Sequence, residues 1–121
     1  MTIFDRLSDR EVETIKNAGT HVTIPADWSP IWEKTPADKA YIILGGEMAV
    51  RRKGEEIARL GAGDIVGEGA IVNNSLRNAS IVTLTKVELI HLSADQVNRL
   101  RGEIPAFAEA LDRLSQERLG S

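Results

Sequence analysis

Residues 67–79 bring glycines, a carboxylate and a guanidinium together in one short segment: Gly67-Glu68-Gly69-Ala70-Ile71-Val72-Asn73-Asn74-Ser75-Leu76-Arg77-Asn78-Ala79. A carboxylate can accept a hydrogen bond from a sugar hydroxyl, and a guanidinium can donate two parallel bonds to phosphate oxygens. Glycines let the backbone approach an anion closely, and we expect the backbone to turn sharply at Gly67. The segment is therefore complementary to a cyclic nucleotide, and a ligand-sensing module is our leading interpretation.

Short apolar or alternating runs surround this segment, and turn residues separate them. They recur about every 8–12 residues, which favours an antiparallel sandwich or barrel. Gly45-Gly46 and Lys53-Gly54 are typical of hairpin turns. The runs predict strands at 21–24, 31–32, 40–44, 47–51, 56–60, 64–66, 80–84 and 88–92.

Helical patterns flank the strands on both sides. Ser8 followed by Glu11, and Ser93 followed by Gln96, have the spacing of a capping box and predict two helix starts. Glycines predict where these helices end, and a proline suits the first turn of a last helix. These residues are Gly19, Gly102 and Pro105, and the last helix carries an apolar stripe of Phe107, Leu111 and Leu114.

The fold class that follows is mainly β. We expect an antiparallel jelly-roll-like β-barrel with one N-terminal helix and two C-terminal helices. The length of 121 residues is that of a single domain, so we assign residues 1–121 to one unit.

Composition excludes several classes of function. Apolar residues make up 42% and charged residues 27%, an ordinary globular balance. The N-terminus lacks the pattern of a signal peptide and no apolar run is long enough for a membrane span, so we expect a cytoplasmic protein without a membrane partner. There are no cysteines, and the only histidines, His21 and His91, match no metal motif, so we expect no metal. A formal charge of −3 argues against a nucleic-acid partner.

Three stretches together resemble the cyclic nucleotide-binding domain family. Residues 36–50 resemble its first hairpin, residues 60–68 resemble the approach to its phosphate-binding cassette, and residues 77–79 resemble the arginine end of that cassette. Their order and spacing also match, and the resemblance covers nearly the whole chain. It implies the barrel and three helices expected above.

The resemblance also implies roles for residues of the loop. Glu68 would accept from the ribose 2′-hydroxyl, and Arg77 would contact the exocyclic phosphate oxygens. The backbone amides of Ala70 and Asn78 would complete the anion site, consistent with the partial positive charge of free amides at a helix start. The residues expected at the ligand are Gly67, Glu68, Gly69, Ala70, Arg77, Asn78 and Ala79.

Three positions differ from the family pattern and leave alternatives open. Gly69 replaces a bulky apolar residue, Leu76 replaces a common proline, and Asn78 stands where Ser, Thr or Ala is commoner. The sequence leaves open whether the ligand is cAMP or cGMP. An alternative is an interaction or scaffold module that has kept the fold and no longer binds nucleotide.

The expected function is sensing without catalysis. The resemblance implies a cyclic nucleotide as the only ligand, with no cofactor, and an effector protein of unknown identity as the partner. The segment from Pro105 to Ser121 is too short for a DNA-reading domain, so we expect the signal to pass through protein contacts. A homodimer through the last helix is left open.

Overall fold

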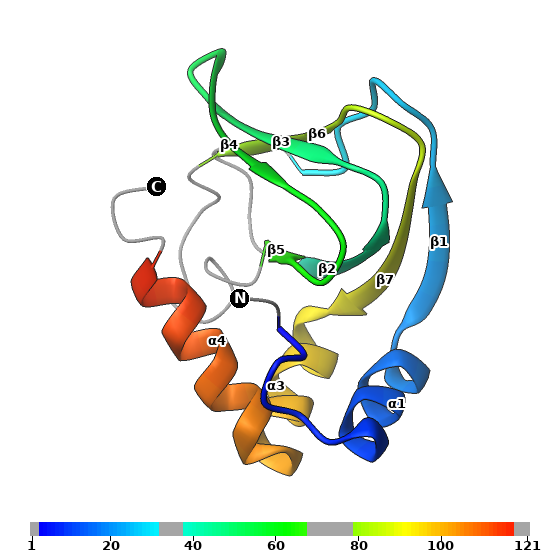
Figure 1. Ribbon diagram of the computed structural model, residues 1–121, viewed down its shortest axis with the longest axis vertical. Coiled ribbons are helices and arrows are strands. Elements are labelled where there is room, and N and C mark those ends of the chain that lie inside the picture. Colours follow the sequence, from blue (N-terminus) through cyan, green and yellow to red (C-terminus); the bar gives the residue numbers. More distant parts are fainter. Residues whose placement is uncertain (1–2, 32–37, 68–78, 118–121) are drawn as a thin grey trace.

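The computed structural model describes residues 3–31, 38–67 and 79–117, with only the backbone of 114–117. Figure 1 shows the arrangement of the helices and strands. Their bounds in chain order are α1 Asp9–Ala18, β1 Thr20–Ile24, β2 Lys39–Gly45, β3 Met48–Arg52, β4 Glu55–Leu60, β5 Ile65–Val66, β6 Ser80–Thr83, β7 Val87–Ser93, α3 Ala94–Glu103 and α4 Pro105–Glu117.

The strands form two antiparallel sheets. One has the order β1-β7-β2-β5 and the other the order β4-β3-β6. The predicted class, mainly antiparallel β with one N-terminal and two C-terminal helices, is confirmed. Within the described residues the two sheets face each other without closing into a continuous barrel. Residue 31, expected in a short strand, instead makes a single bridge to Ile81.

The four-stranded sheet is buried on both faces at strand β2, which divides the core in two. Ala40 and Ile42 of β2 belong to a cluster shared with the helices, whereas Tyr41 and Ile43 belong to a cluster shared with the second sheet. Successive strand residues point to opposite faces, so a strand covered on both sides needs a continuous apolar run. Residues 40–44 of β2, Ala-Tyr-Ile-Ile-Leu, are such a continuous apolar run. The order of layers is therefore helices, four-stranded sheet, three-stranded sheet (Figure 1).

One of the two predicted hairpin turns, Lys53-Gly54, is present and uses positive φ angles. Lys53 and Gly54 have φ of 54° and 82° and join the paired residues Arg52 and Glu55. A two-residue hairpin turn with both φ values positive matches the twist of its strands, and this explains the glycine. The prediction of a hairpin turn at Gly45-Gly46 is wrong. Gly46, with φ of 94°, turns the chain between β2 and β3, which lie in different sheets and do not pair.

Both predicted capping boxes are confirmed, at Ser8 with Glu11 and at Ser93 with Gln96. The prediction that Gly102 ends its helix is wrong by a short distance, because α3 continues through Glu103 and is capped at Ile104. The Ile104 side chain is buried and its N–H donates to Leu100 O at 2.8 Å, so burial fixes where the chain turns. Pro105 then begins α4, as predicted.

The assignment of residues 1–121 to a single domain stays a prediction. None of the helices in the described part of the chain is long and apolar enough to cross a membrane.

Candidate ligand-binding site

The start of the candidate loop is fixed by β5. Ile65 and Val66 are buried and pair with Ile42 and Tyr41 of β2. Gly67 follows with φ of 87°, in the left-handed region that side chains disfavour. The sequence prediction that the backbone turns sharply at Gly67 is confirmed.

A tight turn just before β5 holds this start in place. Asp64 N donates to Gly61 O at 3.1 Å, and Gly61 N donates to the Asp64 carboxylate at 2.8 Å. Two further bonds of 2.8 Å join the turn to Ile43 of β2, one from Gly63 N to Ile43 O and one from Ile43 N to Asp64 O. The approach to the loop is therefore part of the four-stranded sheet.

The N-terminal segment adds a link to the helices. Ile3 N donates to Gly63 O at 2.8 Å, and the Ile3 side chain is fully buried. Its apolar cluster also contains Phe107 and Leu111 of α4. One residue thus contacts both the turn that precedes the loop and the helical core.

The far end of the loop enters the other sheet. Ala79 is buried, and Ser80 begins β6, which pairs with β3 through Ile81 and Val50. The segment between Gly67 and Ala79 therefore joins an edge strand of one sheet to a strand of the facing sheet (Figure 1).

A buried threonine, which sequence reasoning missed, secures β6. Thr83 has no exposed surface, and its hydroxyl donates to Pro25 O at 2.7 Å and accepts from Trp28 N at 2.9 Å. Asp27 N donates to Thr83 O, and Thr83 N donates to Trp28 O. These bonds dock the connection after β1 onto β6. A threonine in a strand gives no sequence signal for such a role, because its partners lie more than fifty residues away.

The predicted ligand residues are divided between described and undescribed parts of the chain. Gly67 and Ala79 are placed at the two ends of the loop. The other five predicted contacts lie outside the described residues, so their roles stay predictions: Glu68, Gly69, Ala70, Arg77 and Asn78.

An ion pair occupies the outer strand of the three-stranded sheet. Arg59 Nε of β4 lies 3.0 Å from the Glu56 carboxylate, and this hydrogen bond and opposite charge raise the pKa of Arg59 above its usual value. Arg59 already has a carboxylate partner, which makes it a weak candidate for an anion ligand. Among the described residues there is no cluster of three or more potential metal ligands.

The family model for the cyclic nucleotide-binding domain matches residues 22–103 of this chain. The chain belongs to the cyclic nucleotide-binding domain family. The matched region contains the whole loop from Gly67 to Ala79, together with both sheets apart from the first residues of β1. The family resemblance stated from the sequence is therefore confirmed.

Individual relatives agree with this assignment. The chain is 31% identical over 104 residues to a cAMP-dependent protein kinase regulatory subunit of Yarrowia lipolytica, covering 84% of this chain and 28% of that protein. The catabolite activator protein of Thermus thermophilus has the same fold, with a TM-score of 0.85 at 24% identity over 97% of this chain and 57% of that one.

A ligand-bound structure is also similar. The regulatory domain of Toxoplasma gondii PKA, solved with cAMP, superposes with a TM-score of 0.71 at 27% identity, covering 81% of this chain and 39% of that one. The chain thus spans less than two thirds of the length of each of these three relatives.

Proposed function

We propose that this chain binds a purine cyclic nucleotide, cAMP or cGMP, at the loop from Gly67 to Ala79, and relays its occupancy to an effector protein without catalysis. The observation that carries the proposal is the family match over residues 22–103, which includes the complete loop. The similar Toxoplasma gondii domain was solved with cAMP, which supports the choice of ligand class.

The loop chemistry that the family resemblance implies is consistent with the proposal. Glu68 would accept from the ribose 2′-hydroxyl and Arg77 would neutralise the cyclic phosphate, helped by the amides of Ala70 and Asn78. A hydrogen bond to a charged group contributes about 1.5–3 kcal/mol net, so two such contacts together with base stacking would bring the affinity into the micromolar range.

The connections at the two ends of the loop support a relay of ligand binding to the rest of the chain. The loop joins the two sheets, and its first end connects through Gly63 and Ile3 to the apolar cluster that holds α4. A nucleotide that repositions the loop would act on both sheets and on this connection. We propose α4 as the element that passes the change outward, in the cytoplasm, to the effector.

Calorimetric titration with cAMP and with cGMP tests binding. A ligand at 100 times its dissociation constant should stabilise the folded state by about 2.7 kcal/mol, so the melting temperature should rise in parallel. A folded protein with neither heat nor a melting shift at millimolar nucleotide would instead favour the scaffold alternative.

Two variants test the roles of the charged residues. Arg77→Ala should weaken binding by about 2–5 kcal/mol, because the phosphate charge would lose its partner in a desolvated site. Arg99→Ala, at an exposed arginine of α3, is the matched control and should bind normally. Glu68→Ala should lose discrimination against a 2′-deoxy nucleotide. Retained discrimination in that variant would show that Glu68 does not contact the sugar.

Hydrogen exchange tests the relay separately. Amide protection within residues 105–117 should change on nucleotide binding if α4 transmits the signal. Normal binding with identical protection in both states would remove α4 from the proposal and leave the ligand assignment intact.

A further inference from the structure

The two sheets have four outer edges, and two of them are covered or short. On β6, the connection after β1 bonds to Ile81 and Thr83. The edge strand β5 contains only two residues. The remaining edges are those of β1 and β4. An exposed edge strand presents unpaired backbone groups, and folded proteins usually protect it with charges, prolines or bulges.

The β4 edge carries this protection. Its pairing with β3 is interrupted by a register shift between Val50 and Arg51. Its side chains include three charged residues, all exposed: Glu55, Glu56 and Arg59. Such an edge resists pairing with another strand.

The β1 edge has none of these features. Thr20–Ile24 pairs with β7 in unbroken register over all five residues. It contains no Lys, Arg, Asp, Glu or Pro, and four of its five residues are β-branched. Within the described residues, nothing pairs with the outer side of β1 (Figure 1).

From this contrast we infer that β1 pairs with β1 of a second copy of the chain, antiparallel and centred on Val22. This register places Val22 opposite Val22, Thr20 opposite Ile24 and His21 opposite Thr23 of the second copy. The interface is isologous, because the same strand supplies both sides. It would extend the four-stranded sheet of each copy into one sheet across the dimer.

The side-chain pattern of β1 is complementary to itself in this register. Val22 and Ile24 pack on the core between the two sheets, so Thr20, Val22 and Ile24 share one face. His21 and Thr23 share the opposite face and are exposed. Pairing about Val22 aligns inner residues with inner residues and outer residues with outer residues. The apolar row of one copy therefore continues into that of the other.

The charges near β1 are compatible with this pairing. His21 lies 3.6 Å from Glu88 of its own copy, on the outer face. Across the interface His21 meets the neutral Thr23, so this register opposes no like charges. A five-residue strand pair buries less area than a standard stable interface, so the dimer should be weak and concentration-dependent.

Charge substitutions at the opposed positions test this register. The double variant His21→Lys with Thr23→Lys would place lysines opposite lysines, and the variant His21→Glu with Thr23→Glu would oppose glutamates. In sedimentation velocity from about 10 µM to about 1 mM, the parent chain should dimerise. Each variant alone should dimerise at least about tenfold more weakly, and an equal mixture of the two should recover dimers.

The matched control adds the same two charges to the other edge strand. Ile57→Lys with Ala58→Lys, at exposed positions of β4, should dimerise like the parent. A parent that stays monomeric at the highest concentration would overturn the proposal. A lysine variant of β1 that dimerises as strongly as the control would also overturn it, because association would then use another surface.

Discussion

The two capping boxes of this protein have the same local geometry and different surroundings. At α1, Ser8 N donates to the Glu11 carboxylate at 2.9 Å and Glu11 N donates to Ser8 Oγ at 3.1 Å, in an exposed position. At α3, the corresponding bonds between Ser93 and Gln96 are 2.8 and 3.2 Å, in a partly buried position. Each box satisfies two N–H groups that have no partner within the helix.

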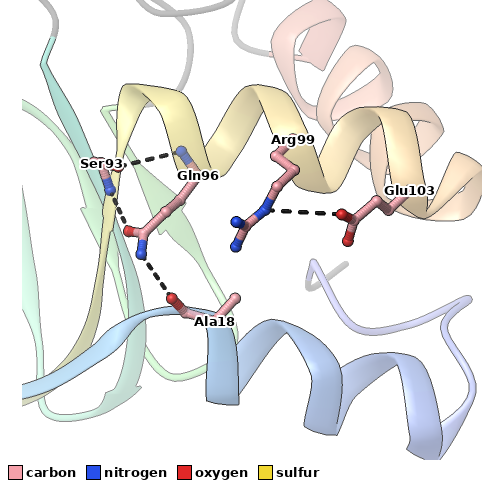
Figure 2. Close-up of polar contacts among 5 residues, drawn as sticks. All are labelled: Ala18, Ser93, Gln96, Arg99 and Glu103. Carbon is pink, nitrogen blue, oxygen red and sulfur yellow. Dashed lines mark hydrogen bonds and ion pairs between the residues drawn. The ribbon is translucent and has the colours of Figure 1, made fainter.

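The two boxes differ in one side-chain atom, which is an amide nitrogen in Gln96 and a carboxylate oxygen in Glu11. Gln96 Nε2 donates a third bond of 2.8 Å to Ala18 O, at the C-terminal end of α1 (Figure 2). A glutamate at this position could accept from Ser93 N but could not donate to Ala18 O, whereas the glutamine amide does both. The same capping signal therefore starts a helix in one place and, in the other, also joins two helices distant in sequence.

The largest expected effect comes from Gly19→Ala, at the residue after Ala18. An added Cβ would lie 2.5 Å from Ile90 Cγ2 and 2.6 Å from His91 O, and the latter is a backbone atom that cannot rotate away. Gly19 has φ of −97°, so the expected loss of about 3 kcal/mol in unfolding free energy would come from overpacking rather than from backbone conformation. Urea denaturation measures it.

Gly102→Ala is the matched control for this substitution. Gly102 stands inside α3, and apart from the neighbouring backbone of its own helix no atom of the described residues lies within 4 Å of a Cβ added there. Alanine is the better helix former there, so this variant should gain about 0.5–1 kcal/mol. Equal effects at the two glycines would show that close contact at Gly19 does not hold β7 against the end of α1.

The sequence predicted both capping boxes, because they depend only on local residue spacing. A serine followed three residues later by Glu or Gln indicated both boxes, because cap and partner lie within one helical turn. The bond from Gln96 to Ala18 joins residues 78 apart, and only the folded sheet brings them together. Gly19 was expected to end α1 and does so, but the reason is the close approach of β7, which the sequence does not encode locally.

The candidate site likewise has some features that the sequence predicted and others that it could not predict. The turn at Gly67 followed from the sequence because glycine is favoured at positive φ, and the structure has φ of 87° there. The buried Thr83 and the link through Ile3 could not be predicted, because both depend on partners distant in sequence. The contacts of Glu68 and Arg77 came from family resemblance and stay predictions.

A smaller effect is expected from Gln96→Glu, which tests the single-atom difference directly. The variant keeps an acceptor for Ser93 N and removes the donor to Ala18 O, leaving a partly buried carbonyl facing a carboxylate oxygen. We expect a loss of about 1–2 kcal/mol in unfolding free energy, measured by urea denaturation at neutral pH. Glu11→Gln makes the reciprocal change in the exposed box and should stay within about 0.5 kcal/mol of the parent. An unchanged unfolding free energy in Gln96→Glu would mean that water takes the place of the amide donor at Ala18 O without loss of stability.

The smallest effect is expected from Arg99→Ala, in the middle of the same helix. Arg99 Nε lies 3.8 Å from Glu103 Oε1 (Figure 2), and the two side chains are 60% and 56% exposed. Water screens so exposed a pair, and the arginine precedes the glutamate, the less favourable order along a helix. The unfolding free energy should therefore change by less than about 0.5 kcal/mol, with no dependence on salt between about 0.05 and about 0.5 M beyond that of the parent. A loss as large as that of Gln96→Glu would show that surface charge, rather than the amide of Gln96, holds α3 in place.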